Sequence, residues 1–152
     1  MQRLITTNWL AIVVNLVAHF ALGMAWYGAL AAPWMEAIEA KTRGFDPQTA
    51  PPIIYLTTVI VVPLATLFIA KLMELANERS IADGVKWGLL LWALVILPML
   101  LMHYAFAGNS LVLTAIDGGF ELASLTLTGV TLGALGFRTR GAVAAQPVPA
   151  AA

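Results

Sequence analysis

The chain has 152 residues, of which 61% are apolar and only 11% are charged. Soluble domains of this length are typically about 45 to 50% apolar and about 25% charged, so a soluble fold could not bury this much apolar surface. The formal net charge is zero and no basic cluster occurs, which argues against a nucleic-acid partner. The absence of cysteine excludes disulfides, thiolate metal sites and thiol catalysis.

Four apolar stretches follow one another, each about as long as the roughly 20 residues that cross a bilayer as a helix. We predict spans at about 9–30, 53–75, 85–106 and 115–137. The expected fold class is therefore all-α, a polytopic integral membrane four-helix bundle formed by residues 1–140 as one domain. Residues 141–152 have no periodicity and two prolines, which is typical of a disordered tail.

Local signals support the helix ends. Start signals precede the spans at Asn8, Pro51-Pro52, Ser80-x-x-Asp83 and Thr114-x-x-Asp117. Pro63 and Pro98 lie inside the second and third spans, where we expect bends and not breaks. Residues 33–43, between the first two spans, read as a short helix in the plane of the membrane interface, since Trp34 and Ile38 are one turn apart.

The basic residues predict the orientation. One side of the membrane would carry Arg3, Lys71, Arg79, Lys86, Arg138 and Arg140, and the other only Lys41 and Arg43. By the positive-inside rule both termini are cytoplasmic. A cleaved signal peptide is the alternative for the first span, but this span is longer than a signal core and carries Asn15 and His19, so we expect it to be retained.

Polar residues inside the spans are the candidates for a site. Asn8, Asn15, His19 and Trp26 fall within about 40° on the first helix, and Asp117, Glu121, Ser124, Thr128 and Thr131 within about 80° on the last. Ionisable groups in a membrane are costly and mark function by default. The candidate buried polar cluster is Asn15, His19, His103, Asp117 and Glu121. Gly129 and Gly133 occupy another face of the last span, where close helix packing or a glycine-mediated dimer is expected.

Structural explanations compete with each functional one. Asp117 suits the positive start of a helix, and His103 suits an interfacial anchor. The role of Asn15 and His19 could be limited to fixing helix packing, with Glu121 as a partner. Two histidines and two carboxylates could also bind a divalent metal or relay protons, and metal binding stays open. The sequence has no phosphate loop, zinc-protease motif or nucleophile elbow, and no cofactor is predicted.

A family resemblance adds to this picture. Asn8-Trp9, Gly23-x-x-Trp26-Tyr27, Trp34 and Ile116-Asp117-Gly118-Gly119-Phe120-Glu121 resemble the family of small bacterial membrane proteins called domain of unknown function 1761, over about residues 8 to 136. The resemblance implies four spans and a bacterial inner membrane, with no established activity. In that family we expect the position of Glu121 to be often histidine or another polar residue. Glu121 shares the polarity of those residues but not the chemistry of a histidine.

Three functions stay open from the sequence. The first expectation is a non-enzymatic partner-binding or accessory subunit, because the loops are short and no catalytic set is recognisable. The second is a small transporter or channel-like protein that uses the candidate polar cluster, which we expect in the outer half of the membrane. The third is an intramembrane metal protein or enzyme. The expected partners are the lipid bilayer and a membrane protein or a second copy of the chain, in a multi-pass protein of the cell inner membrane.

Overall fold

The computed structural model describes residues 8–39 and 53–136, and the regular structure in these two ranges is helical throughout. The elements are α1 (Trp9–Ala29), α2 (Ala31–Glu39), α3 (Ile53–Leu75), α4 (Ile81–Leu91), the π-helical turn η2 (Trp92–Ile96), α5 (Leu97–Ala107), α6 (Leu111–Thr131) and the π-helical turn η3 (Leu132–Gly136). Four helical stretches are long and apolar enough to cross a membrane, namely Trp9–Ala29, Tyr55–Leu75, Ile81–Ala107 and Leu111–Gly136. The predicted four-span helical fold, with a short helix after the first span, is confirmed.

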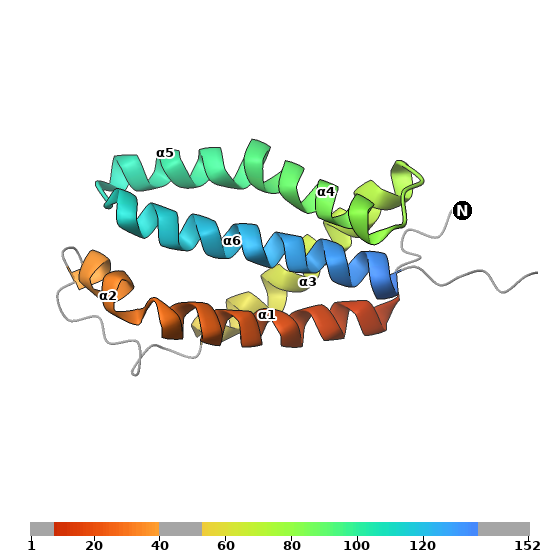
Figure 1. Cartoon of the computed structure of the whole chain (residues 1–152), viewed down its shortest axis with the longest axis horizontal. Helices are drawn as coiled ribbons and strands as arrows, with labels where there is room; N and C mark the ends of the chain where they lie inside the picture. The colour runs from red at the N-terminus through yellow and green to blue at the C-terminus, as the bar shows by residue number, and fades with distance from the viewer. Residues whose placement is uncertain (1–7, 40–52, 137–152) are drawn as a thin grey trace, which may run out of the picture.

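Helix α6 lies at the centre of the arrangement (Figure 1). It runs antiparallel to α1 on one side and packs against α4 on the other, while α3 crosses behind and contacts both α1 and α4. The buried side chains of α6 include apolar residues and also Thr114, Ser124, Thr128 and Thr131. A central helix with a polar face is therefore covered on several sides by helices that are mostly apolar.

Glycines bring α4 and α6 into backbone contact. A Cβ atom built on Gly84 would lie 2.1 Å from the carbonyl oxygen of Gly129, and one on Gly129 would lie 2.2 Å from the carbonyl oxygen of Gly84. Gly88 meets the carbonyl oxygen of Leu125 in the same way, and Gly133 meets the backbone of Ile81. This is the small-residue mode of membrane helix packing. The glycine face is occupied by α4 of the same chain, so a glycine-mediated dimer, the alternative to packing within the bundle, would need another surface.

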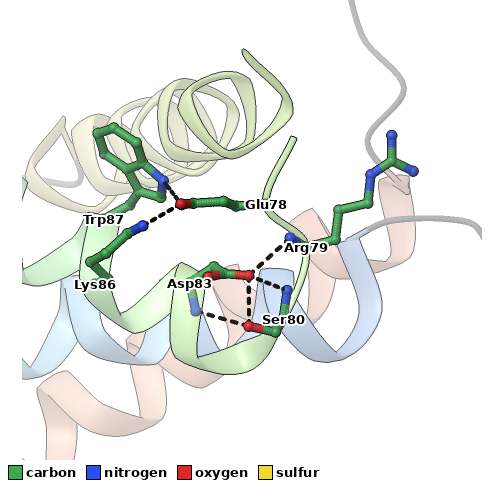
Figure 2. Close-up of polar contacts among 6 residues, drawn as sticks. All are labelled: Glu78, Arg79, Ser80, Asp83, Lys86 and Trp87. Carbon is green, nitrogen blue, oxygen red and sulfur yellow. Dashed lines mark hydrogen bonds and ion pairs between the residues drawn. The ribbon is translucent and has the colours of Figure 1, made fainter. Parts of the chain in front are cut away.

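The helix starts agree with the sequence signals in two cases and differ in one. Asn8 caps α1 by accepting the Leu10 N–H at 3.1 Å. Ser80 and Asp83 form the capping box of α4 (Figure 2). The expected start of the fourth helix at Thr114-x-x-Asp117 is wrong, because Ser110 caps α6 four residues earlier by accepting the Leu113 N–H at 3.1 Å.

The two internal prolines are accommodated differently. Helix α3 continues through Pro63, whereas Pro98 follows the π-helical turn η2. In this turn the Leu97 N–H bonds the carbonyl of Trp92, one residue further back than in an α-helix. Because a proline ring clashes with the preceding turn and offers no N–H, the wider turn makes room for it. The helix is not broken, as expected, and the π-turn is an addition that the sequence did not predict.

The turn between α3 and α4 is held by local polar contacts, with Asn77 in the left-handed region at φ 56°. Glu78 accepts the Trp87 Nε1–H at 2.8 Å and pairs with Lys86, and Asp83 accepts the backbone N–H groups of Arg79 and Ser80 (Figure 2). These contacts fix the angle at which α4 leaves α3.

Several sequence predictions lie outside the described residues. Helix α2 begins at Ala31 and is described to Glu39, so the rest of the expected short helix at 33–43 is not covered. The same holds for the prolines before α3, for the tail, and for Arg3, Lys41, Arg43, Arg138 and Arg140.

Candidate functional site

The polar side chains of α1 all turn toward the C-terminal helix. At one end, the Asn8 side chain donates to the carbonyl of Leu135 at 3.0 Å, and its backbone N–H donates to that of Gly136 at 2.8 Å. At the other end, Trp26 Nε1–H donates to the carbonyl of Ile116 at 3.1 Å. The predicted stripe on α1 and the predicted polar face of α6 are therefore two sides of one antiparallel interface. Rotation of either helix would strand polar groups in lipid, so these bonds set the register.

Asn15 joins three helices and is fully buried. Its Nδ2 donates to Thr66 Oγ1 on α3 at 2.8 Å and to Thr128 Oγ1 on α6 at 3.0 Å. Both threonine hydroxyls already donate to carbonyls of their own helices, so they can only accept from Asn15, and this fixes the orientation of the amide. The amide oxygen Oδ1 is left without a hydrogen-bond donor in the described part of the chain.

His19 lies one turn further along α1 and is half-buried. Its Nδ1 lies 2.7 Å from Ser124 Oγ, and its ring meets Phe120 edge-on at a centroid distance of 5.2 Å. Among the described residues no hydrogen bond or ion pair joins His19 to Glu121. The partner of His19 is therefore the serine on the face of α6, and the carboxylate expected from the sequence is not bonded to it.

Asp117 is surrounded by aromatic donors. Its Oδ1 accepts from Tyr27 Oη at 3.0 Å and from Trp34 Nε1 at 3.2 Å, and its Oδ2 accepts from Tyr104 Oη at 2.7 Å. These donors come from α1, α2 and α5, so one carboxylate ties three helices to α6. Asp117 lies in the second turn of α6 and not at its start, so the helix-terminus explanation does not apply. Its charge is satisfied by the protein.

Tyr27, Trp34 and Tyr104 were not among the residues that the sequence predicted for a site, because tyrosine and tryptophan are common at the interfaces of any membrane protein. A signal was present, because Tyr27 and Trp34 belong to the motifs that carry the family resemblance. The Tyr27 and Trp34 rings also meet edge-on at a centroid distance of 5.2 Å. The aromatic residues at this end of the bundle therefore pack together around one half-buried acceptor.

Glu121 lies one turn from Asp117 on α6 and faces a pocket of about 240 Å³ between α1, α3 and α6. The rest of its lining mixes polar side chains, namely His19, Thr57, Thr58, Ser124 and Thr128, with apolar ones, namely Val61, Val62, Ala65, Phe120 and Leu125. No hydrogen bond to the Glu121 carboxyl occurs within residues 8–39 and 53–136. Its oxygens are thus free of donors from the described helices and face the pocket.

The candidate cluster therefore divides into separate sites. Asn15 belongs to a buried network, Asp117 to an aromatic cage, and His19 and Glu121 to the pocket. His103 is exposed on α5 and does not join any of them. In the described ranges no group of three or more His, Asp or Glu residues could hold a metal ion. Geometry thus adds no support to the hypothesis of a metal protein.

A second hollow separates α5 from α6. It has a volume of about 360 Å³ and a mostly apolar lining that includes Trp92, Leu97, Leu101 and Gly118. Trp92 spans it by donating Nε1–H to the carbonyl of Gly118 at 2.8 Å, and α5 itself contributes no buried residue. The C-terminal half of the third span is therefore only loosely packed on the bundle.

Comparison with known proteins gives one match. The family model described as "Protein of unknown function (DUF1761)" matches residues 10–133, which is most of the chain and includes all four spans. No curated protein and no solved structure matches the chain. The matched range contains every residue of the aromatic cage and of the pocket described above. The chain belongs to this family of proteins of unknown function.

Proposed function

We propose that this protein is a small carrier or channel-like protein of the cell inner membrane that binds a small polar solute in the pocket beside Glu121. The observation that carries the proposal is the contrast between the two carboxylates of α6. Asp117 has three donors, whereas Glu121 faces the pocket with none from the described helices. An ionisable group kept inside a membrane span without a structural partner is best explained by a ligand.

The pocket has the properties of a solute site. Its volume of about 240 Å³ is below the usual range of about 300 to 1,000 Å³ for drug-sized ligands, so the solute has few non-hydrogen atoms. Its wall carries the hydroxyls of Thr57, Thr58 and Ser124 beside the His19 ring. Three helices contribute to this wall, so a relative shift of α3 against α1 and α6 would open or close it.

The basic residues support the orientation within this proposal. Lys71, Arg79 and Lys86 lie at the end of the bundle where α3 turns into α4. The positive-inside rule makes this end cytoplasmic, which places α2 and the early turns of α3 on the outer side. The pocket then lies near the middle of the membrane, with Thr57 and Thr58 at its outer side. Reporter fusions after Arg140 and within residues 44–50 should give opposite signals, and equal signals would contradict this orientation.

A partner-binding or accessory subunit is the second candidate, and one observation favours it. The hollow between α5 and α6 is apolar, and α5 has no buried residue, so a helix of another membrane protein has room to pack there. Crosslinking from an exposed α5 position such as Met102 would detect such a neighbour. Co-purification of one protein in stoichiometric amount is the expected result for this candidate.

The chain contains no cysteine, so single cysteines can test the pocket directly. Ala65 and Leu64 are neighbours in the middle of α3, but Ala65 lines the pocket and Leu64 is 59% exposed on the outer surface of the bundle. In intact membranes, Ala65→Cys should react with a charged, membrane-impermeant thiol reagent and Leu64→Cys should not, because thiols react with such reagents only where water reaches them. No reaction at Ala65→Cys would overturn the proposed site.

A further inference from the structure

We infer that the solute bound in this pocket is a small cation, either a monovalent metal ion or a small ammonium ion. The inference rests on the proposed function, since it assumes that the pocket is a binding site. It follows from the sign of the charges and from the kind of hydrogen-bonding group that the helices leave unsatisfied.

The charge around the pocket is negative. Glu121 lines it, and Asp117 lies one helical turn away on the same helix. The basic residues in the part of the chain that the structure describes are Lys71, Arg79 and Lys86, at the opposite end of the bundle. Two of these have acidic partners of their own, Glu74 for Lys71 and Glu78 for Lys86. The described carboxylates toward this end are Asp117 and Glu121 on α6 and the exposed Glu36 on α2, and no described basic side chain lies there.

The carboxyl group in the pocket wall is an unsatisfied acceptor. The Glu121 carboxyl has no donor from the described helices, and Asn15 Oδ1 is a fully buried acceptor without one. Asn15 does not line the pocket, so Glu121 is the acceptor that a solute would meet there. A buried acceptor without a donor is costly, and a cation or a group that donates hydrogen bonds relieves that cost.

An anion would find few partners in the same place. The Thr128 hydroxyl is already used as a donor to the carbonyl of Ser124. The Ser124 hydroxyl and His19 Nδ1 share one hydrogen bond of 2.7 Å, which leaves only one donor of this neutral pair, a ring N–H or the hydroxyl, for a solute. An anion would also be repelled by Glu121. The helices thus select against negative charge both by electrostatics and by their shortage of donors.

The test compares two thiol reagents of similar size and opposite charge on Ala65→Cys in intact membranes. Trimethylammonioethyl methanethiosulfonate is cationic, and sulfonatoethyl methanethiosulfonate is anionic. Each rate is divided by the rate with the uncharged thiol β-mercaptoethanol, which removes the intrinsic difference in reactivity. We expect the corrected rate to be at least about fivefold higher for the cation, the effect of two unit charges about 4 Å apart in water.

Glu121→Gln should reduce the ratio of the corrected rates, cationic reagent over anionic reagent, to about one, because it keeps the shape of the side chain and removes the charge. Glu36→Gln, which removes an exposed carboxylate from α2, should leave it unchanged. Methylammonium chloride should slow labelling by the cationic reagent relative to N-methylglucamine chloride at equal ionic strength. If the anionic reagent labels Ala65→Cys at the same corrected rate as the cationic reagent, or faster, the cation inference is overturned. If neither reagent labels Ala65→Cys, the proposed function itself is overturned.

Discussion

Asp117 and Glu121 are carboxylates one turn apart on the same helix, and their surroundings are opposite. Asp117 accepts three hydrogen bonds from tyrosine and tryptophan donors on three other helical segments. Glu121 borders a pocket and has no such bond from the described helices. The comparison teaches that an ionisable residue in a membrane span can have a structural purpose, so that the search for function should begin with the group whose partners are missing.

The largest effect expected from this comparison is loss of stability on removal of the structural carboxylate. Asp117→Ala leaves the Tyr27, Trp34 and Tyr104 donors without their acceptor and releases α2 and α5 from α6. Membrane hydrogen bonds contribute about 0.6 to 1 kcal/mol each, so the free energy of unfolding should fall by about 2 to 3 kcal/mol. Reversible unfolding in mixed micelles measures this. A loss no larger than that of Glu121→Ala would break the distinction between the two carboxylates.

A smaller effect is expected from one donor of the cage. Tyr104→Phe keeps the ring and removes the bond of 2.7 Å to Asp117 Oδ2, so it should cost about 1 kcal/mol. In the Asp117→Ala background the same change should cost much less, because the bond is already lost. Fully additive losses in this double-mutant cycle would show that Tyr104 stabilises the bundle in some other way.

His19 forms its hydrogen bond with Ser124 and not with Glu121 in the described structure. A cycle of His19→Leu with Ser124→Ala should give a coupling of about 1 kcal/mol, since the two atoms lie 2.7 Å apart. The cycle of His19→Leu with Glu121→Gln should give a smaller coupling, because no bond joins them in the described structure. The reverse order of the two couplings would contradict the placement of His19.

The smallest expected effect is that of neutralising Glu121. Glu121→Gln breaks no hydrogen bond to the described helices, so the free energy of unfolding should change by less than about 0.5 kcal/mol. Thermal unfolding in detergent is sufficient to check this. A loss comparable with that of Asp117→Ala would assign Glu121 to the framework of the bundle and remove the basis for the pocket proposal.

The sequence predicts the fold better than the site, for a physical reason. Bilayer thickness imposes a length and an apolar composition on every span, and both are visible in one sequence. The start of α6 was misplaced because Ser110 and Thr114 offer similar caps, and the π-turn before Pro98 depends on tertiary packing. The Gly84 and Gly88 spacing on α4 was a readable signal for close packing that was overlooked.

Within the site, periodicity identified the polar faces of the first and last spans but not their pairing. Helical spacing places Asn15 and His19 on one face, yet it cannot say which α6 residue stands opposite each. His103 and Asp117 looked equally plausible as members of one cluster, and only the packing of α5 separates an exposed histidine from the aromatic cage. Partners that lie far apart in sequence set the role of each polar group, and that information requires the structure.

The central claim, that the two carboxylates differ in access, can be measured in one experiment. Dicyclohexylcarbodiimide enters membranes and adds the O–H of a carboxylic acid across one N=C bond to give an O-acylisourea. The acyl group then moves from oxygen to nitrogen, which leaves a stable N-acylurea that mass spectrometry can locate by peptide mapping. In native membranes the label should be found on Glu121, which faces the pocket, and not on Asp117, which is enclosed by three donors. Labelling of Asp117 to an equal or greater extent, or of neither residue, would contradict the account.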